Sequence, residues 1–132
     1  MRSSLSVSAH RHPEGTVQLA GSRAALRQLA TLVRAEKPVT ADLSVSPDQS
    51  SSVGWLGSLL IEPNDDDSLL VRTEGNAVIF AGNQGSRDLL AQNIEAVADD
   101  PHDPLNHLHI EYFPGHFYIR KGSTPLIVKP DK

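Results

Sequence analysis

Residues 17–33 read VQLAGSRAALRQLATLV, and residues 78–97 read VIFAGNQGSRDLLAQNIEAV. Each stretch begins as an apolar strand, passes through Ala-Gly to a helix-capping side chain and continues with apolar residues at helical spacing. The cap is Ser22 in the first stretch and either Asn83 or Ser86 in the second. A strand that leads directly into an amphipathic helix is therefore predicted twice. Each helix must bury its apolar stripe against a sheet or against the other helix.

The segments around these two stretches also correspond. Leu59-Leu-Ile61 and Leu126-Ile-Val128 each precede one charged residue and a proline, and each unit follows a short strand and a Glu-Gly turn. These correspondences predict an internal duplication, with one unit over residues 1–63 and the other over residues 64–132. The length of 132 residues suits a single domain that contains both units.

Short loops and alternating strands favour antiparallel pairing. We therefore predict an α+β fold in which the duplicated strand-helix-strand units form a largely antiparallel sheet, with both helices packed on one face. Residues 10–15, HRHPEG, are predicted to be a turn. The residues expected to point into the core are Leu26, Leu29, Val33, Leu90, Ile94 and Val97.

The net charge of −4 and the pI of about 5.8 argue against nucleic acid as a partner, because a binder of nucleic acid carries a basic patch. The chain has no cysteine, which excludes disulfides and thiolate chemistry. No apolar run is long enough for a signal-peptide core or a membrane span. We therefore expect a cytoplasmic protein without a membrane partner.

Four of the six histidines lie between residues 102 and 116. Within this range, the alternating strand predicted over residues 106–112 places His107, His109 and Glu111 on one face. Two imidazoles and a carboxylate are ligands that suit zinc. The other interpretation is that this face is solvated while the opposite, apolar face packs on the helices. Because only His116 could add a convergent ligand, we predict no metal and no cofactor, and keep His107, His109 and His116 as metal candidates.

Motifs of catalysis are missing from the sequence. There is no G-x-S-x-G nucleophile motif, and the paired carboxylates lie in segments that are predicted to be loops. Residues 82–85, GNQG, lack the complete dinucleotide fingerprint and are better explained as a helix start. The chain is therefore predicted not to be an enzyme.

Residues 112–118, YFPGHFY, hold four of the six Phe, Tyr and Trp residues. They suit either a tight turn with its aromatic rings partly in the core, or an exposed aromatic turn that anchors a partner. Trp55, between Gly54 and Gly57, has the same two interpretations: its ring either fills the core or is an exposed contact. The predicted partner-binding residues are His107, His109, Glu111, Tyr112, Phe113, His116, Phe117 and Tyr118.

Residues 107–116, HLHIEYFPGH, together with residues 89–94, LLAQNI, and 123–126, STPL, resemble the immunity protein 32 family of predicted immunity proteins from bacterial polymorphic toxin systems. The resemblance covers about residues 76–128, and the first half of the chain agrees only in pattern. It implies a protein that is encoded beside a secreted toxin and protects the producing cell by binding that toxin. It implies no catalytic residues.

Three hypotheses follow for the function. The first is a non-enzymatic immunity protein that neutralises a cognate toxin by direct binding, for which an acidic inhibitor of a basic toxin is electrostatically suited. The second is a metal-binding protein or metal-dependent enzyme that uses His107, His109, Glu111 and His116. The third is a structural homodimer whose sheets pair at an edge.

Overall fold

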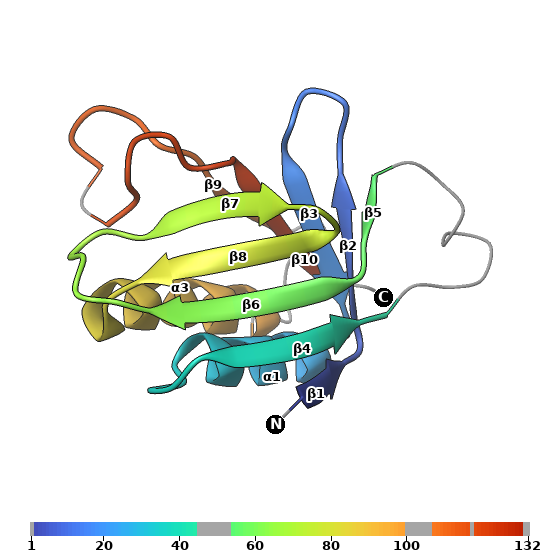
Figure 1. Cartoon of the computed structure of the whole chain (residues 1–132). Coiled ribbons are helices and arrows are strands. Elements are labelled where there is room, and N and C mark those ends of the chain that lie inside the picture. The colour runs from blue at the N-terminus through green and yellow to red at the C-terminus, as the bar shows by residue number, and fades with distance from the viewer. Residues whose placement is uncertain (1, 45–53, 100–106, 117, 131–132) are drawn as a thin grey trace.

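The computed structural model describes residues 2–44, 54–99, 107–116 and 118–130. Figure 1 shows two helices lying side by side behind one sheet, with a second sheet crossing the right-hand end of the first. The first sheet has the order β1 (Arg2–Leu5), β4 (Val39–Leu43), β6 (Ser58–Pro63), β8 (Ala77–Gly82) and β7 (Leu70–Glu74). The second has the order β5 (Trp55–Leu56), β2 (Val7–Arg11), β3 (Val17–Gly21), β10 (Leu126–Pro130) and β9 (Leu108–Ile110).

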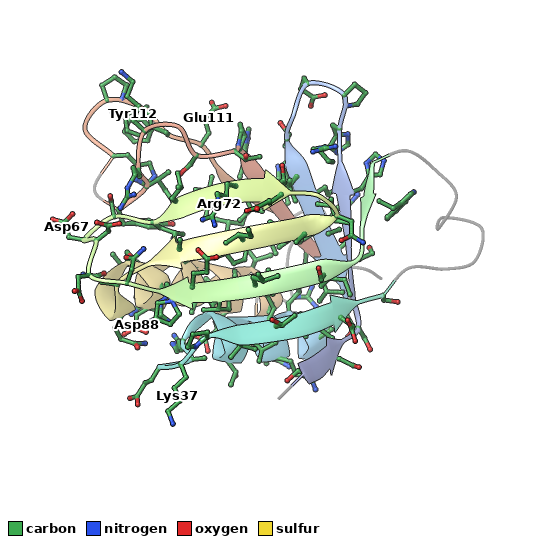
Figure 2. All side chains as sticks on the ribbon, in the orientation of Figure 1. Lys37, Asp67, Arg72, Asp88, Glu111 and Tyr112 are labelled. Atoms are coloured by element: carbon green, nitrogen blue, oxygen red, sulfur yellow. The ribbon has the colours of Figure 1, made fainter. Side chains whose placement is uncertain are left out.

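The α+β class is confirmed, but the strands form two mixed sheets where one largely antiparallel sheet was predicted. The pairs β1–β4, β3–β10 and β6–β8 are parallel, and the other five strand pairs of the described residues are antiparallel. Both helices lie on one face of the first sheet, as expected, and they also contact the second. The opposite face of the first sheet carries Arg72, and neither helix of the described residues lies over it (Figure 2).

The two halves pair in the same way. In the second sheet, β3 runs parallel to β10 with Val17 opposite Leu126. In the first sheet, β8 runs parallel to β6 with Val78 opposite Leu59. Each half thus contributes a hairpin to one sheet and a returning strand pair to the other. The origin of the halves by duplication remains a prediction.

The helices begin where the capping residues predicted. In α1 (Arg23–Val33) the Ser22 hydroxyl accepts a hydrogen bond of 3.1 Å from the Ala25 N–H. In α3 (Gln84–Asp99) the Asn83 Oδ1 accepts one of 2.9 Å from the Ser86 N–H. Each cap satisfies one of the free N–H groups of a first helical turn.

The glycine before each cap permits a close approach. A Cβ atom on Gly21 would lie 3.0 Å from the carbonyl oxygen of Ser6, and one on Gly82 would lie 2.5 Å from the Ser86 Oγ. The repeated Ala-Gly in the sequence therefore reflects a packing need at the turn from strand to helix.

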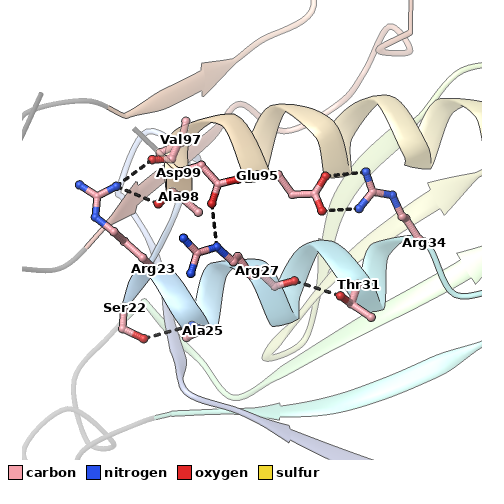
Figure 3. A network of polar contacts seen from close by, with 10 residues as sticks. All are labelled: Ser22, Arg23, Ala25, Arg27, Thr31, Arg34, Glu95, Val97, Ala98 and Asp99. Atoms are coloured by element: carbon pink, nitrogen blue, oxygen red, sulfur yellow. Dashed lines mark hydrogen bonds and ion pairs between the residues drawn. The ribbon is translucent and has the colours of Figure 1, made fainter. Parts of the chain in front are cut away.

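Arginines join the two helices (Figure 3). The Arg23 side chain donates to the carbonyl oxygens of Val97 and Ala98 at the end of α3, at 3.3 and 2.8 Å. The Arg34 guanidinium makes two bonds of 2.6 Å to the Glu95 carboxylate. The Arg34 hydrogen bond lowers the pKa of Glu95, while burial acts in the opposite direction. Carbonyls at a helix C-terminus carry partial negative charge, so arginine suits that position.

The predicted core is confirmed, since none of its six residues is more than 5% exposed. Five of them, all except Val97, belong to one cluster of buried side chains that includes residues of both helices and both sheets. No helix among the described residues has the length and apolar character needed to span a membrane.

Candidate partner-binding surface

The predicted alternation along β9 is confirmed. His109 is exposed, as is His107 just before the strand, while Ile110 is buried. The two histidines lie on the outer face of the second sheet, beside a hollow of about 250 Å³ that His107 lines with Gln18, Ile127 and Lys129. The solvated face and the packed face are therefore those that the sequence indicated.

This face holds further rings that the sequence analysis did not connect with His109. The strand registers place Trp55, His10, Gln18, Ile127 and His109 opposite one another in one row across the second sheet. The His10 ring lies 4.7 Å from the half-buried Trp55 ring. The alternating residues 10–12, HRH, could have indicated that the strand continues and that His10 lies on this face, but they were predicted to be a turn.

The metal hypothesis gains no support from the structure. Among the residues that it describes, no three His, Asp or Glu side chains are grouped so that they could hold a metal ion. His116 does not converge with the strand histidines on a common point; its Nδ1 atom is engaged by the backbone of its own turn.

The aromatic turn is well defined. The His116 N–H donates a hydrogen bond of 2.9 Å to the Phe113 carbonyl oxygen, and Gly115 has a φ of +90°. Pro114 followed by a glycine with positive φ is the signature of a type II turn. The turn leaves Phe113 with 57% of its surface exposed.

The His116 side chain stabilises the chain that leaves the turn. Its Nδ1 accepts hydrogen bonds from the N–H groups of Tyr118 and Ile119, at 3.2 and 3.1 Å. An imidazole nitrogen that accepts must be unprotonated, so the ring is neutral with its proton on Nε2. Burial lowers the pKa of His116, which favours the same form. The Phe113 ring lies 4.8 Å away, so the supporting ring is in contact distance of the exposed one.

Tyr118 fixes the turn to the rest of the fold. Its side chain is 3% exposed, and its hydroxyl accepts a hydrogen bond of 2.6 Å from the Asn93 side chain on α3. Burial raises the pKa of Tyr118, and the bond from Asn93 acts in the opposite direction. The Tyr118 carbonyl accepts from the Leu69 N–H at 2.6 Å, next to β7. A helix and the edge of the first sheet therefore hold the aromatic turn.

The predicted partner-binding residues now divide by position. His107, His109, Glu111 and Phe113 are exposed, whereas Tyr112 and His116 are half-buried and Tyr118 is buried. Phe117 lies outside the described residues. An exposed side chain can contact a partner directly, while a buried one can only position its neighbours.

The described residues define an α+β protein that presents an exposed aromatic turn on a rigid frame. The model of the immunity protein 32 family matches residues 77–130, from β8 through α3, β9 and the aromatic turn to β10. That match confirms, over this stretch, the resemblance found in the sequence. Neither a curated protein nor a solved structure matches the chain.

Proposed function

We propose that this protein is an immunity protein that neutralises a cognate bacterial toxin by binding it in the cytoplasm of the producing cell, without catalysing a reaction. The match of residues 77–130 to the immunity protein 32 family supports the class. The main support for the proposed binding site is the exposure of Phe113. This side chain is 57% exposed on a well-defined turn inside the matched stretch.

Phe113 has the properties of an interface anchor. Aromatic side chains near the centre of an interface supply much of the binding energy, because they bury a large area with few rotatable bonds. The His116 and Tyr118 contacts hold the turn in place before the partner arrives, and preorganisation reduces the entropy lost on binding. We assign direct contact to His107, His109, Glu111, Tyr112 and Phe113, and positioning to His116 and Tyr118. Phe117 remains a proposed contact of the same segment.

Growth rescue tests the function. The protein encoded by the neighbouring reading frame is expressed in a host cell with and without this chain. We expect arrest without the chain and growth with it, together with co-purification of the two proteins. The proposal would be contradicted if the neighbouring protein does not arrest growth, or if this chain does not relieve the arrest.

A variant pair tests the site. Phe113→Ser should weaken toxin binding by about 30-fold or more, since a hot-spot residue is worth at least about 2 kcal/mol. Lys37→Ser changes an exposed residue that Figure 2 places on the opposite side of the molecule from Tyr112, and it should leave binding within about threefold. Melting curves of both variants show whether the fold is kept, and light scattering of the free protein reports whether it is a homodimer.

A further inference from the structure

The open face of the first sheet is a second surface, and neither described helix packs on it. In β6 and β8 the side chains that point toward the helices, such as Leu59 and Phe80, are buried. The alternate residues, among them Leu60 and Glu62, point the other way. Figure 2 shows Arg72 on this open face. We call the face the acidic face, defined by Asp42, Leu60, Glu62, Arg72, Glu74 and Ile79.

The negative charge of the chain is concentrated in the stretch of sequence that supplies five of these six residues. Residues 40–74 hold seven carboxylates and one arginine, whereas the rest of the chain holds nine carboxylates and eleven lysines and arginines. The net charge of −4 thus arises from this segment, while the remainder is slightly positive. Asp65, Asp66 and Asp67, in the loop that follows β6, are all exposed and add to the same region.

Arg72, the arginine among these six residues, is already paired with a carboxylate. Its Nη2 lies 3.0 and 3.2 Å from the two carboxylate oxygens of Glu62, and 3.8 Å from Glu74. The Arg72–Glu62 pair joins β7 to β6 and so crosses β8, on which Ile79 is only 2% exposed. The half-buried Leu60 lies on the same face, and the Glu74 carboxylate, 74% exposed, stands at the rim. Polar, solvent-accessible side chains are typical of the rim of a protein interface.

We infer that the acidic face docks a basic surface of the toxin; this inference rests on the proposed function. Opposite charge attracts such a surface and accelerates its association. A second copy of the chain would bring the same carboxylates together, and like charges oppose that pairing. A nucleic acid is repelled for the same reason.

The acidic face and the aromatic turn are continuous along β7. The Thr124 N–H donates to the Val71 carbonyl oxygen at 2.7 Å, and the Arg120 N–H donates to the Leu69 carbonyl oxygen at 2.8 Å. Arg120 also pairs with Asp66 of the acidic loop. Figure 2 places Tyr112 and Glu111 beyond β7, on the side away from β4. One toxin molecule can therefore meet both surfaces, with the aromatic turn as anchor and the acidic face as electrostatic guide.

Charge reversal at two corresponding positions tests this inference. Glu74 and Glu14 are both exposed, and each precedes a glycine with positive φ in a hairpin turn, Gly75 or Gly15. Glu74 belongs to the acidic face, whereas Glu14 belongs to the β2–β3 turn of the second sheet. Glu74→Lys and Glu14→Lys change the net charge equally, so a difference between them reports position.

Association with the neighbouring reading frame's product is measured by stopped flow at low and high salt. Glu74→Lys should slow association about tenfold at low salt and flatten its salt dependence, whereas Glu14→Lys should change the rate by less than about threefold. Equal effects of the two variants, or no effect of either, would overturn the inference and leave the proposed function standing. Wild-type protein that does not bind the product at all would overturn both. A wild-type dimer that Glu74→Lys alone dissociates would identify a second copy as the occupant and overturn the inference.

Discussion

The guanidinium of Arg87, in the first turns of α3, donates a hydrogen bond of 2.8 Å to the carbonyl oxygen of Val33, the last residue of α1. It also donates to the carbonyl oxygens of Ala35 and Gly82, at 2.5 and 3.1 Å. The side chain is 2% exposed, and burial lowers the pKa of Arg87. Backbone carbonyls at a helix end thus compensate a buried positive charge, as they do for Arg23 at the end of α3.

Arg87→Lys should destabilise the protein strongly. A lysine ammonium is a single point of donation and cannot reproduce the fork that reaches three carbonyl groups. We expect the free energy of unfolding in urea to fall by about 2–4 kcal/mol, the range for breaking a buried charged network. Arg27→Lys is the control, because the Arg27–Asp99 pair is more than half exposed on both sides and should change stability by less than about 1 kcal/mol. Similar losses in both variants would contradict the role given to Arg87.

Local sequence patterns predicted the elements better than their pairing. Ser22 marked the first helix start, and Asn83, one of two candidate caps, marked the second, because capping is decided within one turn of chain. The division into two sheets depends on β3 pairing with β10 and β6 with β8, and no local pattern records which distant strands meet. The turn predicted from His10 onward begins later, since β2 continues to Arg11, whose N–H donates to the Gly54 carbonyl oxygen at 2.7 Å.

The candidate surface shows the same division. The exposed faces of His107 and His109 follow from alternation, which the sequence displays. The burial of Tyr118 does not follow, because it depends on Asn93 of α3 and on the edge of β7. Sequence reasoning therefore located the segment but could not separate its contact residues from its positioning residues.

The neutral ring of His116 predicts a pH dependence of stability. Burial holds the pKa of His116 below 6.5, so between the two values the unfolded chain binds a proton that the folded protein does not. The free energy of unfolding therefore falls as the pH decreases below about 6.5. His116→Asn keeps an acceptor oxygen but does not titrate. Urea unfolding at pH 7.5 and 5.5 should show a smaller difference for the variant than for the wild type, and an unchanged difference would contradict this account.

Tyr118→Phe removes the hydroxyl that accepts the bond from Asn93. The ring stays in the core, but the Asn93 amide loses its acceptor, and we expect a loss of about 1 kcal/mol in the free energy of unfolding. Tyr112→Phe is the control in the same segment, where the half-buried ring should cost less than about 0.5 kcal/mol. Chemical denaturation of both variants measures the difference, and a Tyr112 loss equal to that of Tyr118 would remove Asn93 from the explanation.

Gly115→Ala tests whether the turn geometry itself is needed for binding. Gly115 has a φ of +90°, and an added Cβ would meet no atom within 4 Å, so the cost of alanine arises from the backbone alone. Gly122 has a φ of +94° and equally open surroundings, but it lies beyond the aromatic turn. Each alanine should therefore lower stability by a similar amount, about 1–2 kcal/mol. Toxin affinity, measured at a temperature where both variants are folded, should fall about tenfold for Gly115→Ala, because strain at Gly115 redirects Phe113, and should stay within about twofold for Gly122→Ala. If the two glycines affect affinity alike, the orientation of Phe113 is not what the partner recognises.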